Sequence, residues 1–255
     1  MHKVAVRVLL FAKAREISGK KEDVVTVYSK ISYSELFDFI VRYFALEDIK
    51  SSLILAINEQ YSDANIPLKL NDGDTIAIIP PLSGGLSLGY VLTRVSRYLI
   101  NIYCLQVSML EVKLSNVELN INDVYKKVIS EDCGAVSLFV GTTRDNFNDL
   151  RVKRLVYESY DEMAVKMMNN VCHEINQQWP QVRNIVIHHR LGEVPVGDAS
   201  IVIAISSPHR SDSLEAVRFA IDRIKAVVPI FKKEEYENGD AQWKQNNECS
   251  WSQNS

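Results

Sequence analysis

Apolar and polar positions alternate in short β-branched stretches over the first 80 residues, which is the pattern of strands with one buried face. A turn signal at Ser18-Gly19 separates the first two stretches, so they predict a hairpin. Ser32 and Glu35 have the spacing of a capping box, and apolar residues recur at helical intervals after them. The strands are predicted at residues 4–11, 24–27, 53–57 and 75–79. The order ββαββ describes a small β-grasp domain.

The chain after residue 106 has strand and helix patterns in alternation, which is typical of an α+β domain. The predicted strands cover residues 107–114, 135–141, 152–158, 184–189 and 200–206. The predicted helices cover residues 122–130, 161–178 and 212–227, the last of which is stopped by Pro229. Asn238-Gly239 indicates a terminal hairpin that joins residues 230–234 to residues 241–244.

Residues 86–106 separate the two patterned regions and have no clean period, so we interpret them as a linker. The sequence therefore predicts an α+β fold class with two domains, at residues 1–85 and 107–255. The linker is apolar enough to be considered as a membrane span. Arg94 and Arg97 lie in its middle, however, and each would cost about 2.5 to 3.5 kcal/mol on insertion, so we expect no membrane association.

Composition narrows the class of protein further. The chain is 47% hydrophobic and 24% charged, as in ordinary globular proteins, and its net charge of −3 gives no general attraction for nucleic acid. The first residues lead directly into a strand pattern without the apolar core of a secretory signal. Four widely separated cysteines favour reduced thiols in the cytosol over a zinc site or a redox pair: Cys104, Cys133, Cys172 and Cys249.

The first candidate for chemistry is Gly84-Gly85, which follows the extended segment Pro80-Pro81-Leu82-Ser83. A tail without side chains can thread a narrow channel and present its backbone carbonyl to another active site. Taken alone, a pair of glycines after a strand is more often a simple turn or linker. The β-grasp order that precedes this pair favours the delivery role.

Two further candidates lie at the ends of the last predicted helix. Ser207 to Asp212 precede this helix, so free backbone N–H groups and the guanidinium of Arg210 suit a phosphate. A capped helix with a surface arginine is about as consistent with these residues. Lys225 lies in its last turn, and Lys232 and Lys233 follow on the next strand. We expect these ammonium groups to converge and stabilise an anion, unless they only complement the helix dipole.

A polar loop, Gly141-Thr142-Thr143-Arg144-Asp145-Asn146, suits a polar heterocycle or a phosphate, although most such loops are solvated turns. His188-His189 suggests a metal site, but neighbours on a strand point to opposite faces and cannot reach one ion. Cys133 has no motif that supplies a base, so we assign it no role. No metal and no cofactor are expected.

Together these residues resemble molybdopterin synthase. Residues 1–85 are similar to its small sulfur-carrier subunit, and residues 107–255 are similar to its large catalytic subunit, which implies a hammerhead-type α+β fold for the second domain. The tail ending at Gly85 carries the first similarity. The second is carried by Gly141-Thr142-Thr143-Arg144, Pro208-His209-Arg210 and residues 225–234.

The resemblance implies a role for each matching residue. Gly85 would be adenylated and converted to a thiocarboxylate by a separate ATP-dependent sulfurtransferase, and Gly84 would give access. Lys225 would be the principal catalytic lysine, with Lys232 beside it. The remaining contacts to the substrate, a cyclic pyranopterin monophosphate, would come from Thr142, Thr143, Arg144, His209, Arg210, Lys233 and Glu234.

The implied reaction is sulfur transfer from the thiocarboxylate to the pyranopterin, which forms the dithiolene of molybdopterin. The tetrahedral anion formed on the way would be stabilised by Lys225 and Lys232. The resemblance also implies a dimer of large domains with a carrier docked at each end. The alternative from another class is a ubiquitin-like carrier whose second domain is only a scaffold for another thiolation pathway.

One departure from the family concerns the carrier tail. Gly85 is followed by Leu86, so a peptide bond stands where the family has a free carboxylate, and an amide cannot be adenylated. Either a protease cuts after Gly85, or the sequence joins two reading frames that are made as separate chains.

Overall fold

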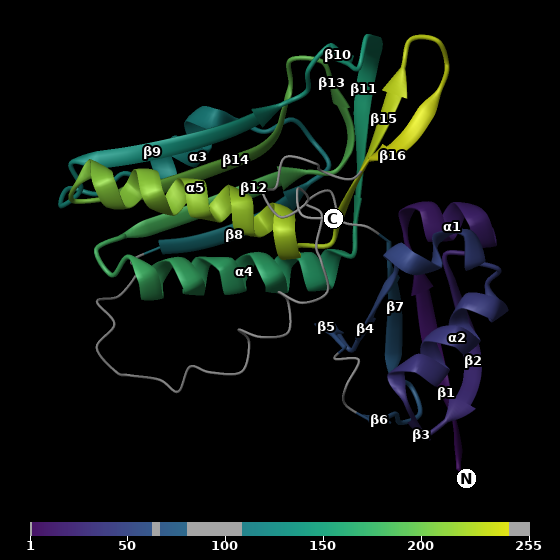
Figure 1. Ribbon diagram of the computed structural model, residues 1–255. Helices are drawn as coiled ribbons and strands as arrows, with labels where there is room; N and C mark the ends of the chain where they lie inside the picture. The colour runs from purple at the N-terminus through teal and green to yellow at the C-terminus, as the bar shows by residue number, and fades with distance from the viewer. Residues whose placement is uncertain (1, 63–66, 81–108, 245–255) are drawn as a thin grey trace. The chain divides into compact units, whose positions relative to one another are not determined.

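The computed structural model describes residues 2–62, 67–80 and 109–244. The chain divides into two compact units, which are described separately below (Figure 1). The predicted linker at 86–106 and the Gly84-Gly85 tail lie outside the described residues. The boundaries drawn between the predicted domains therefore stay predictions.

The N-terminal unit is built on a five-stranded sheet with the order β2-β1-β7-β4-β5. Strand β1 pairs with β7 in parallel, and the other neighbours are antiparallel. The strands are β1 (Lys3–Leu10), β2 (Glu22–Tyr28), β4 (Ile54–Ile57), β5 (Gln60–Tyr61) and β7 (Thr75–Ile79), and a separate pair is formed by β3 (Lys30–Ile31) and β6 (Leu68–Lys69). With helix α2 (Tyr33–Tyr43) across it, this sheet confirms the β-grasp prediction.

Helix α2 begins at the predicted capping box. The Ser32 hydroxyl accepts from the Glu35 N–H at 3.2 Å, and the Glu35 carboxylate accepts from the Ser32 N–H at 3.0 Å. The helix buries Leu36, Ile40 and Val41 against the sheet in the core of this unit. The 3₁₀ helix η1 (Glu47–Ser52) then leads into β4.

The connection between β1 and β2 differs from the prediction. The two strands pair as expected, but helix α1 (Ala12–Ser18) lies between them, where a turn was predicted near Ser18-Gly19. Seven residues are too few to show a clear helical period, and the helix buries only small side chains, Ala12 and Ala14. Gly19 ends it with a φ of 69°, a left-handed conformation that glycine adopts without strain.

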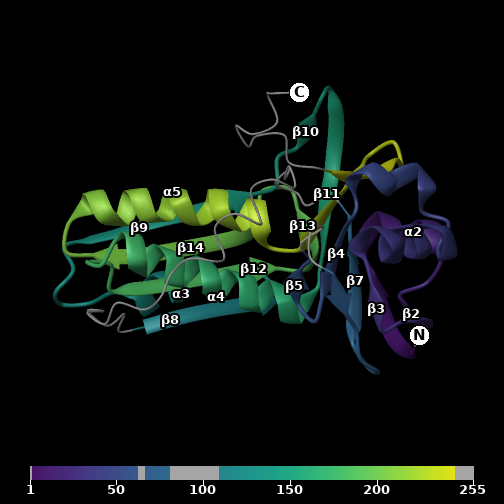
Figure 2. The ribbon, with the colours of Figure 1, turned by 60° about the horizontal axis from the view of Figure 1, so that its bottom comes forward.

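The C-terminal unit contains a four-stranded sheet with the order β8-β12-β14-β9. Its strands are β8 (Met109–Ser115), β12 (Asn184–Arg190), β14 (Ala199–Ser207) and β9 (Ala135–Thr142). Helices α4 (Asp161–Gln178) and α5 (Arg210–Val227) cover one face, and α3 (Ile121–Val128) covers the other (Figures 1 and 2). This arrangement confirms the α+β prediction.

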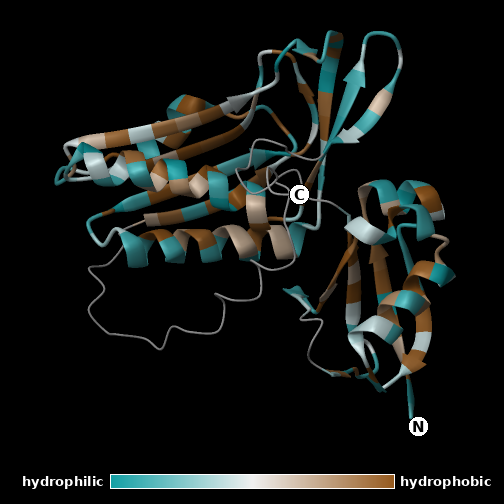
Figure 3. Cartoon of the chain, viewed as in Figure 1, coloured by the Kyte–Doolittle hydropathy of each residue, from teal (hydrophilic) through white to brown (hydrophobic). Residues whose placement is uncertain are grey.

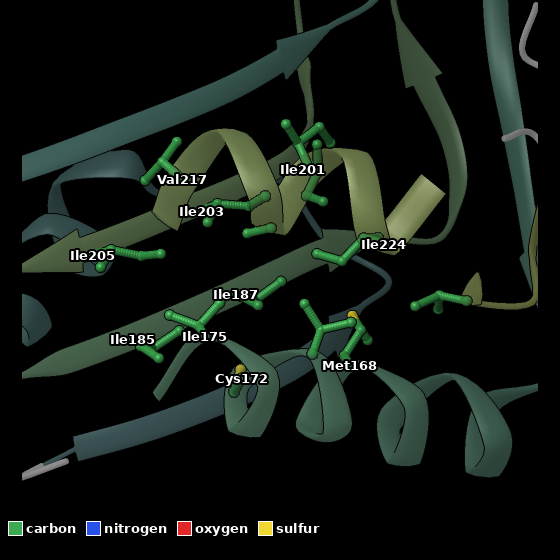
Figure 4. Close-up of a cluster of buried hydrophobic side chains, with 14 of the residues drawn as sticks. Met168, Cys172, Ile175, Ile185, Ile187, Ile201, Ile203, Ile205, Val217 and Ile224 are labelled. Carbon is green, nitrogen blue, oxygen red and sulfur yellow. The ribbon is translucent and has the colours of Figure 1, made fainter. Parts of the chain in front are cut away.

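The two central strands have apolar side chains on both faces. Ile185 and Ile203 point toward α4 and α5 in the main core (Figure 4), whereas Val186 and Val202 pack toward α3. All but one residue of β12, and all of β14, are buried. A sheet covered on both sides needs continuous apolar runs in place of alternation, which explains the brown strands between the helices in Figure 3.

A second sheet extends the C-terminal unit. It has the order β10-β11-β15-β16, with β13 paired to β11, and consists of β10 (Asn146–Phe147), β11 (Leu150–Ser159), β13 (Gly192–Pro195), β15 (Ile230–Tyr236) and β16 (Ala241–Lys244). Strands β15 and β16 are the predicted terminal hairpin. Strands β10 and β13 were not predicted because two to four residues show no period. Within the described ranges, no helix is long and apolar enough to cross a membrane.

Candidate functional site

Helix α5 separates the candidate residues into two groups. It runs back along β9 and β14, so its two ends lie over opposite ends of these strands (Figure 1). His209 and Arg210 are at its start, and Lys225 is in its last turn. Fifteen residues of helix separate Arg210 from Lys225, which corresponds to about 22 Å.

The first group, His209 and Arg210, forms what we call the histidine–arginine end. Ser213 in the first turn of α5 and Ser137 on β9 share a buried hydrogen bond of 2.8 Å, which fixes this end of the helix on the sheet. Both members of the group are exposed, and the N-cap residue His209 has no side-chain cap bond within the described part of the chain. The backbone N–H groups here thus suit an anion, with Arg210 adding a cation.

The second group lies at the other end of α5, which we call the lysine end. It contains Lys225 and, at the end of β9, the exposed residues Thr142 and Arg144. Thr143 is buried, and its hydroxyl donates to the Val194 carbonyl at 3.3 Å. Its side chain therefore supports the neighbouring β13 strand.

Lys232 joins this end through a short connection from α5. The chain turns at Val228-Pro229, where the Pro229 carbonyl accepts from the Tyr160 N–H at 3.2 Å and the Val228 carbonyl accepts from the Ile230 N–H at 2.8 Å. Lys225 and Lys232 thus lie on either side of a turn that one backbone hydrogen bond ties to Tyr160, the residue before α4. The distance between their backbones is set by this turn.

The side chain of Lys232 lies beside a buried carboxylate. Its Nζ is 3.3 Å from Oε1 of Glu234, which is only 4% exposed. The second carboxylate oxygen, Oε2, accepts from the hydroxyl of Tyr236 at 2.8 Å. Burial, together with the hydrogen bond to the Glu234 carboxylate, raises the pKa of Tyr236, so the phenol remains a donor.

Lys233 faces away from this group, because neighbours on a strand point to opposite sides. Its Nζ lies 5.5 Å from the centroid of the Trp243 ring on β16, at the distance of a cation–π contact. Our expectation that Lys232 and Lys233 converge is therefore wrong in its geometry. The reasoning that separated the two adjacent histidines applies equally to the two adjacent lysines.

Two aromatic residues on the Lys232 face, Tyr157 and Tyr236, were not predicted from the sequence. Tyr236 lies four residues beyond Lys232, and Tyr157 on β11 is directly opposite Lys232 in the strand register. Burial raises the pKa of Tyr157. The period of two along the strand would have pointed to Tyr236, whereas the position of Tyr157 depends on a pairing between distant segments.

The two adjacent histidines point to opposite faces of the sheet, as expected. His188 Nε2 lies 2.6 Å from Oε1 of Glu111, on the side of α3. The rings of His189 and Tyr157 pack edge to face, with their centroids 4.9 Å apart. Nδ1 of His189 lies 2.8 Å from the Arg190 carbonyl oxygen, which can only accept a hydrogen bond, so this nitrogen carries the proton. Neither the histidines nor any other described residues form a group of three or more potential metal ligands.

The described cysteines do not have the environment of a nucleophile. Burial raises the pKa of the Cys133 thiol and raises that of Cys172 to about 12. Cys172 is part of the core between α4 and the sheet (Figure 4). Both thiols are protonated at neutral pH, which is consistent with assigning Cys133 no role.

Comparisons with known proteins match two different families to two parts of the chain. A model of the ThiS family matches residues 8–85, and a model of the MoaE protein matches residues 114–227. A curated molybdopterin synthase catalytic subunit from Aedes aegypti is 54% identical over 143 residues, which cover 55% of this chain and 92% of that protein. The chain belongs to the molybdopterin synthase catalytic subunit family.

Two further matches are 51% and 37% identical to this chain. A catalytic subunit from Taeniopygia guttata is 51% identical over 140 residues, covering 55% of this chain and 90% of its own length. A solved molybdopterin synthase structure from Staphylococcus aureus is 37% identical, with a TM-score of 0.49, and covers 51% of this chain and 94% of that chain.

The buried imidazole of His189 predicts a pH dependence of stability. Burial lowers its pKa to about 4, below the value near 6.5 expected in the unfolded chain. The stabilisation is complete above about pH 6.5 and is lost as the pH falls toward 4, because the unfolded state then binds the extra proton. When the pH is lowered from 7 to 4.5, the free energy of unfolding should fall in both proteins. We expect the fall to be about 2 to 3 kcal/mol smaller in His189→Phe than in the parent chain.

Urea unfolding at the two pH values measures this difference. The exposed His173 provides the control, since His173→Gln should lose as much stability as the parent. Equal losses in the parent chain and in His189→Phe would show that the imidazole is not held neutral by burial.

Proposed function

We propose that this chain is a molybdopterin synthase that transfers sulfur from a thiocarboxylate at Gly85 to cyclic pyranopterin monophosphate. The observation that supports it most is the lysine end of the C-terminal unit, where Lys225 and Lys232 flank one fixed turn in a chain of this family. A cationic pair of this kind suits the tetrahedral oxyanion that forms when water adds to the acyl carbon, before the sulfur leaves with the pyranopterin and the Gly85 carboxylate is regenerated. The substrate and the sulfurtransferase reaction are both part of the proposal.

Each residue at the lysine end has a specific role in this reaction. Lys225 and Lys232 stabilise the tetrahedral oxyanion, and Glu234 holds Lys232 beside it through the 3.3 Å contact. The exposed Thr142 and Arg144 contact the pterin, and Thr143 supports them from within the fold. Lys233 stabilises the terminal hairpin through Trp243.

The histidine–arginine end belongs to the substrate site of a second copy. Arg210 and Lys225 of one chain are about 22 Å apart along α5, farther than one pyranopterin monophosphate extends. In a two-fold dimer, each copy presents the same surfaces to the other, so His209 and Arg210 of one copy can bind the phosphate next to the lysines of its partner. Self-association is therefore part of the proposed active site.

The carrier half requires a free carboxylate at Gly85. We propose that the chain is processed after Gly85, or made as two chains, and that a separate ATP-dependent sulfurtransferase then charges this glycine. The wide separation of the four cysteines in the sequence supports a reducing, cytosolic location for these steps. The alternative scaffold function predicts a charged carrier without any product.

Turnover distinguishes the enzyme from the scaffold. Thiocarboxylated carrier and cyclic pyranopterin monophosphate, incubated with the protein, should give the dithiolene product, and Lys225→Ala should lower the rate by at least about a hundredfold. Lys126→Ala, on the exposed side of α3, is the matched control and should retain full activity. Charged carrier that persists without product in the parent protein would support the scaffold function.

Mixing two inactive variants tests the two-copy site. Arg210→Ala and Lys225→Ala should each be inactive, but random exchange between them should restore about a quarter of the parent rate, because mixed dimers contain one intact site. Lys225→Ala mixed with Lys232→Ala should stay inactive, since both changes lie at one end. No recovery in the first mixture, with dimers demonstrated, would place all the residues in one chain.

The mass of the isolated native protein tests the role of Gly85. We expect an amino-terminal fragment that ends at Gly85, part of which carries sulfur in place of one oxygen. An active preparation that contains only the continuous chain would exclude sulfur delivery through this glycine.

A further inference from the structure

Tyr236 is a buried tyrosine whose hydroxyl reaches the candidate site. Its side chain is 2% exposed and packs with Val152, Leu155 and Val194 in the small core of the second sheet. The strand period places Lys232, Glu234 and Tyr236 on one face of β15. The ring is thus held by packing, and only its hydroxyl contacts the polar group.

Each oxygen of the Glu234 carboxylate has a different partner, and the two contacts differ in length. The Tyr236 hydroxyl donates to Oε2 at 2.8 Å, the usual length of such a bond, whereas Nζ of Lys232 lies 3.3 Å from Oε1. A fully engaged ammonium and carboxylate would be about 2.7 to 2.9 Å apart. The phenol therefore holds the carboxylate firmly, and the ammonium is held loosely.

We propose that Tyr236 is a positioning residue, which occupies one oxygen of Glu234 so that the carboxylate orients Lys232 without sequestering its ammonium group. The proposal rests on the proposed function, in which Lys232 must turn toward an oxyanion. Without the hydroxyl, a buried carboxylate with one unsatisfied oxygen would engage the ammonium more closely. Lys232 would then remain with Glu234 when the substrate needs it.

The other polar groups on this face leave the Glu234 carboxylate to Tyr236 and Lys232. Tyr157 faces Lys232 from β11, and Lys244 faces it from β16. Nζ of Lys244 bonds Gln242 at 2.9 Å and lies 4.4 Å from the centroid of the Phe147 ring, so it has partners apart from Glu234. Its ammonium is also 5.7 Å from the Tyr236 ring centroid, which adds to the forces that hold the ring.

Competitive acetylation of the full chain measures the reactivity of the Lys232 amino group and does not require the enzymatic reaction. Trace acetic anhydride labels each lysine in proportion to its reactivity, and peptide mass spectrometry gives Lys232 relative to the exposed Lys126. We expect labelling of Lys232 to fall roughly fivefold in Tyr236→Phe, the ratio that corresponds to one ordinary hydrogen bond. In Glu234→Gln it should rise, because the counter-charge is removed.

The double variant separates positioning from packing. In Glu234→Gln, adding Tyr236→Phe should leave the labelling of Lys232 unchanged, since the phenol acts only through the carboxylate. Glu235→Gln, one residue further along the strand and on its opposite face, pairs with Arg154 and should have no effect. Unchanged or faster labelling in Tyr236→Phe, or an equal effect of that change in both backgrounds, would overturn the proposal.

Kinetics provides the second measurement. We expect kcat of Tyr236→Phe to fall roughly fivefold with little change in KM, because the lysine acts on the transition state. The labelling result does not depend on the reaction, so a protein that makes no product disproves the proposed function without deciding the role of Tyr236. Normal turnover with unaltered labelling disproves only the positioning role.

Discussion

The packing of α5 along β9 and β14 determines where His209, Arg210 and Lys225 lie. The helix buries Ala216, Ala220 and Ile224 in the main core, so it can neither slide nor rotate without exposing apolar surface. Its fixed direction takes the chain from the histidine–arginine end to the lysine end. The distance between these groups is a property of the core, and a flexible loop cannot change it.

This constraint explains why a site that looks continuous in the sequence is divided in the structure. His209, Arg210 and Lys225 lie within 17 residues of each other, and the family resemblance implied that they line one pocket. A helix converts that separation into length, because each residue adds about 1.5 Å. The proposed two-copy site would bring the two groups together without any change to the core.

Much of the fold was predictable because long elements have a clear period. Helix α4 was predicted with the bounds that the structure gives it, and the capping box placed α2 correctly. Short elements such as α1 and β10 were missed, since their few residues carry little pattern. In the candidate site, the lysines were proposed from their clustering in the sequence and Glu234 from the family resemblance. Tyr157 was not found because strand register joins residues that are far apart in sequence.

The turn at Val228-Pro229 has a consequence for how such proteins diversify. A backbone hydrogen bond ties it to Tyr160 at the start of α4. The distance between Lys225 and Lys232 therefore does not depend on sequence changes in other parts of the unit. Insertions in the outer hairpins, or drift in the surface of α3, leave this spacing untouched. A single residue added or deleted between the two lysines, in contrast, would change the distance between them and the hydrogen bond to Tyr160.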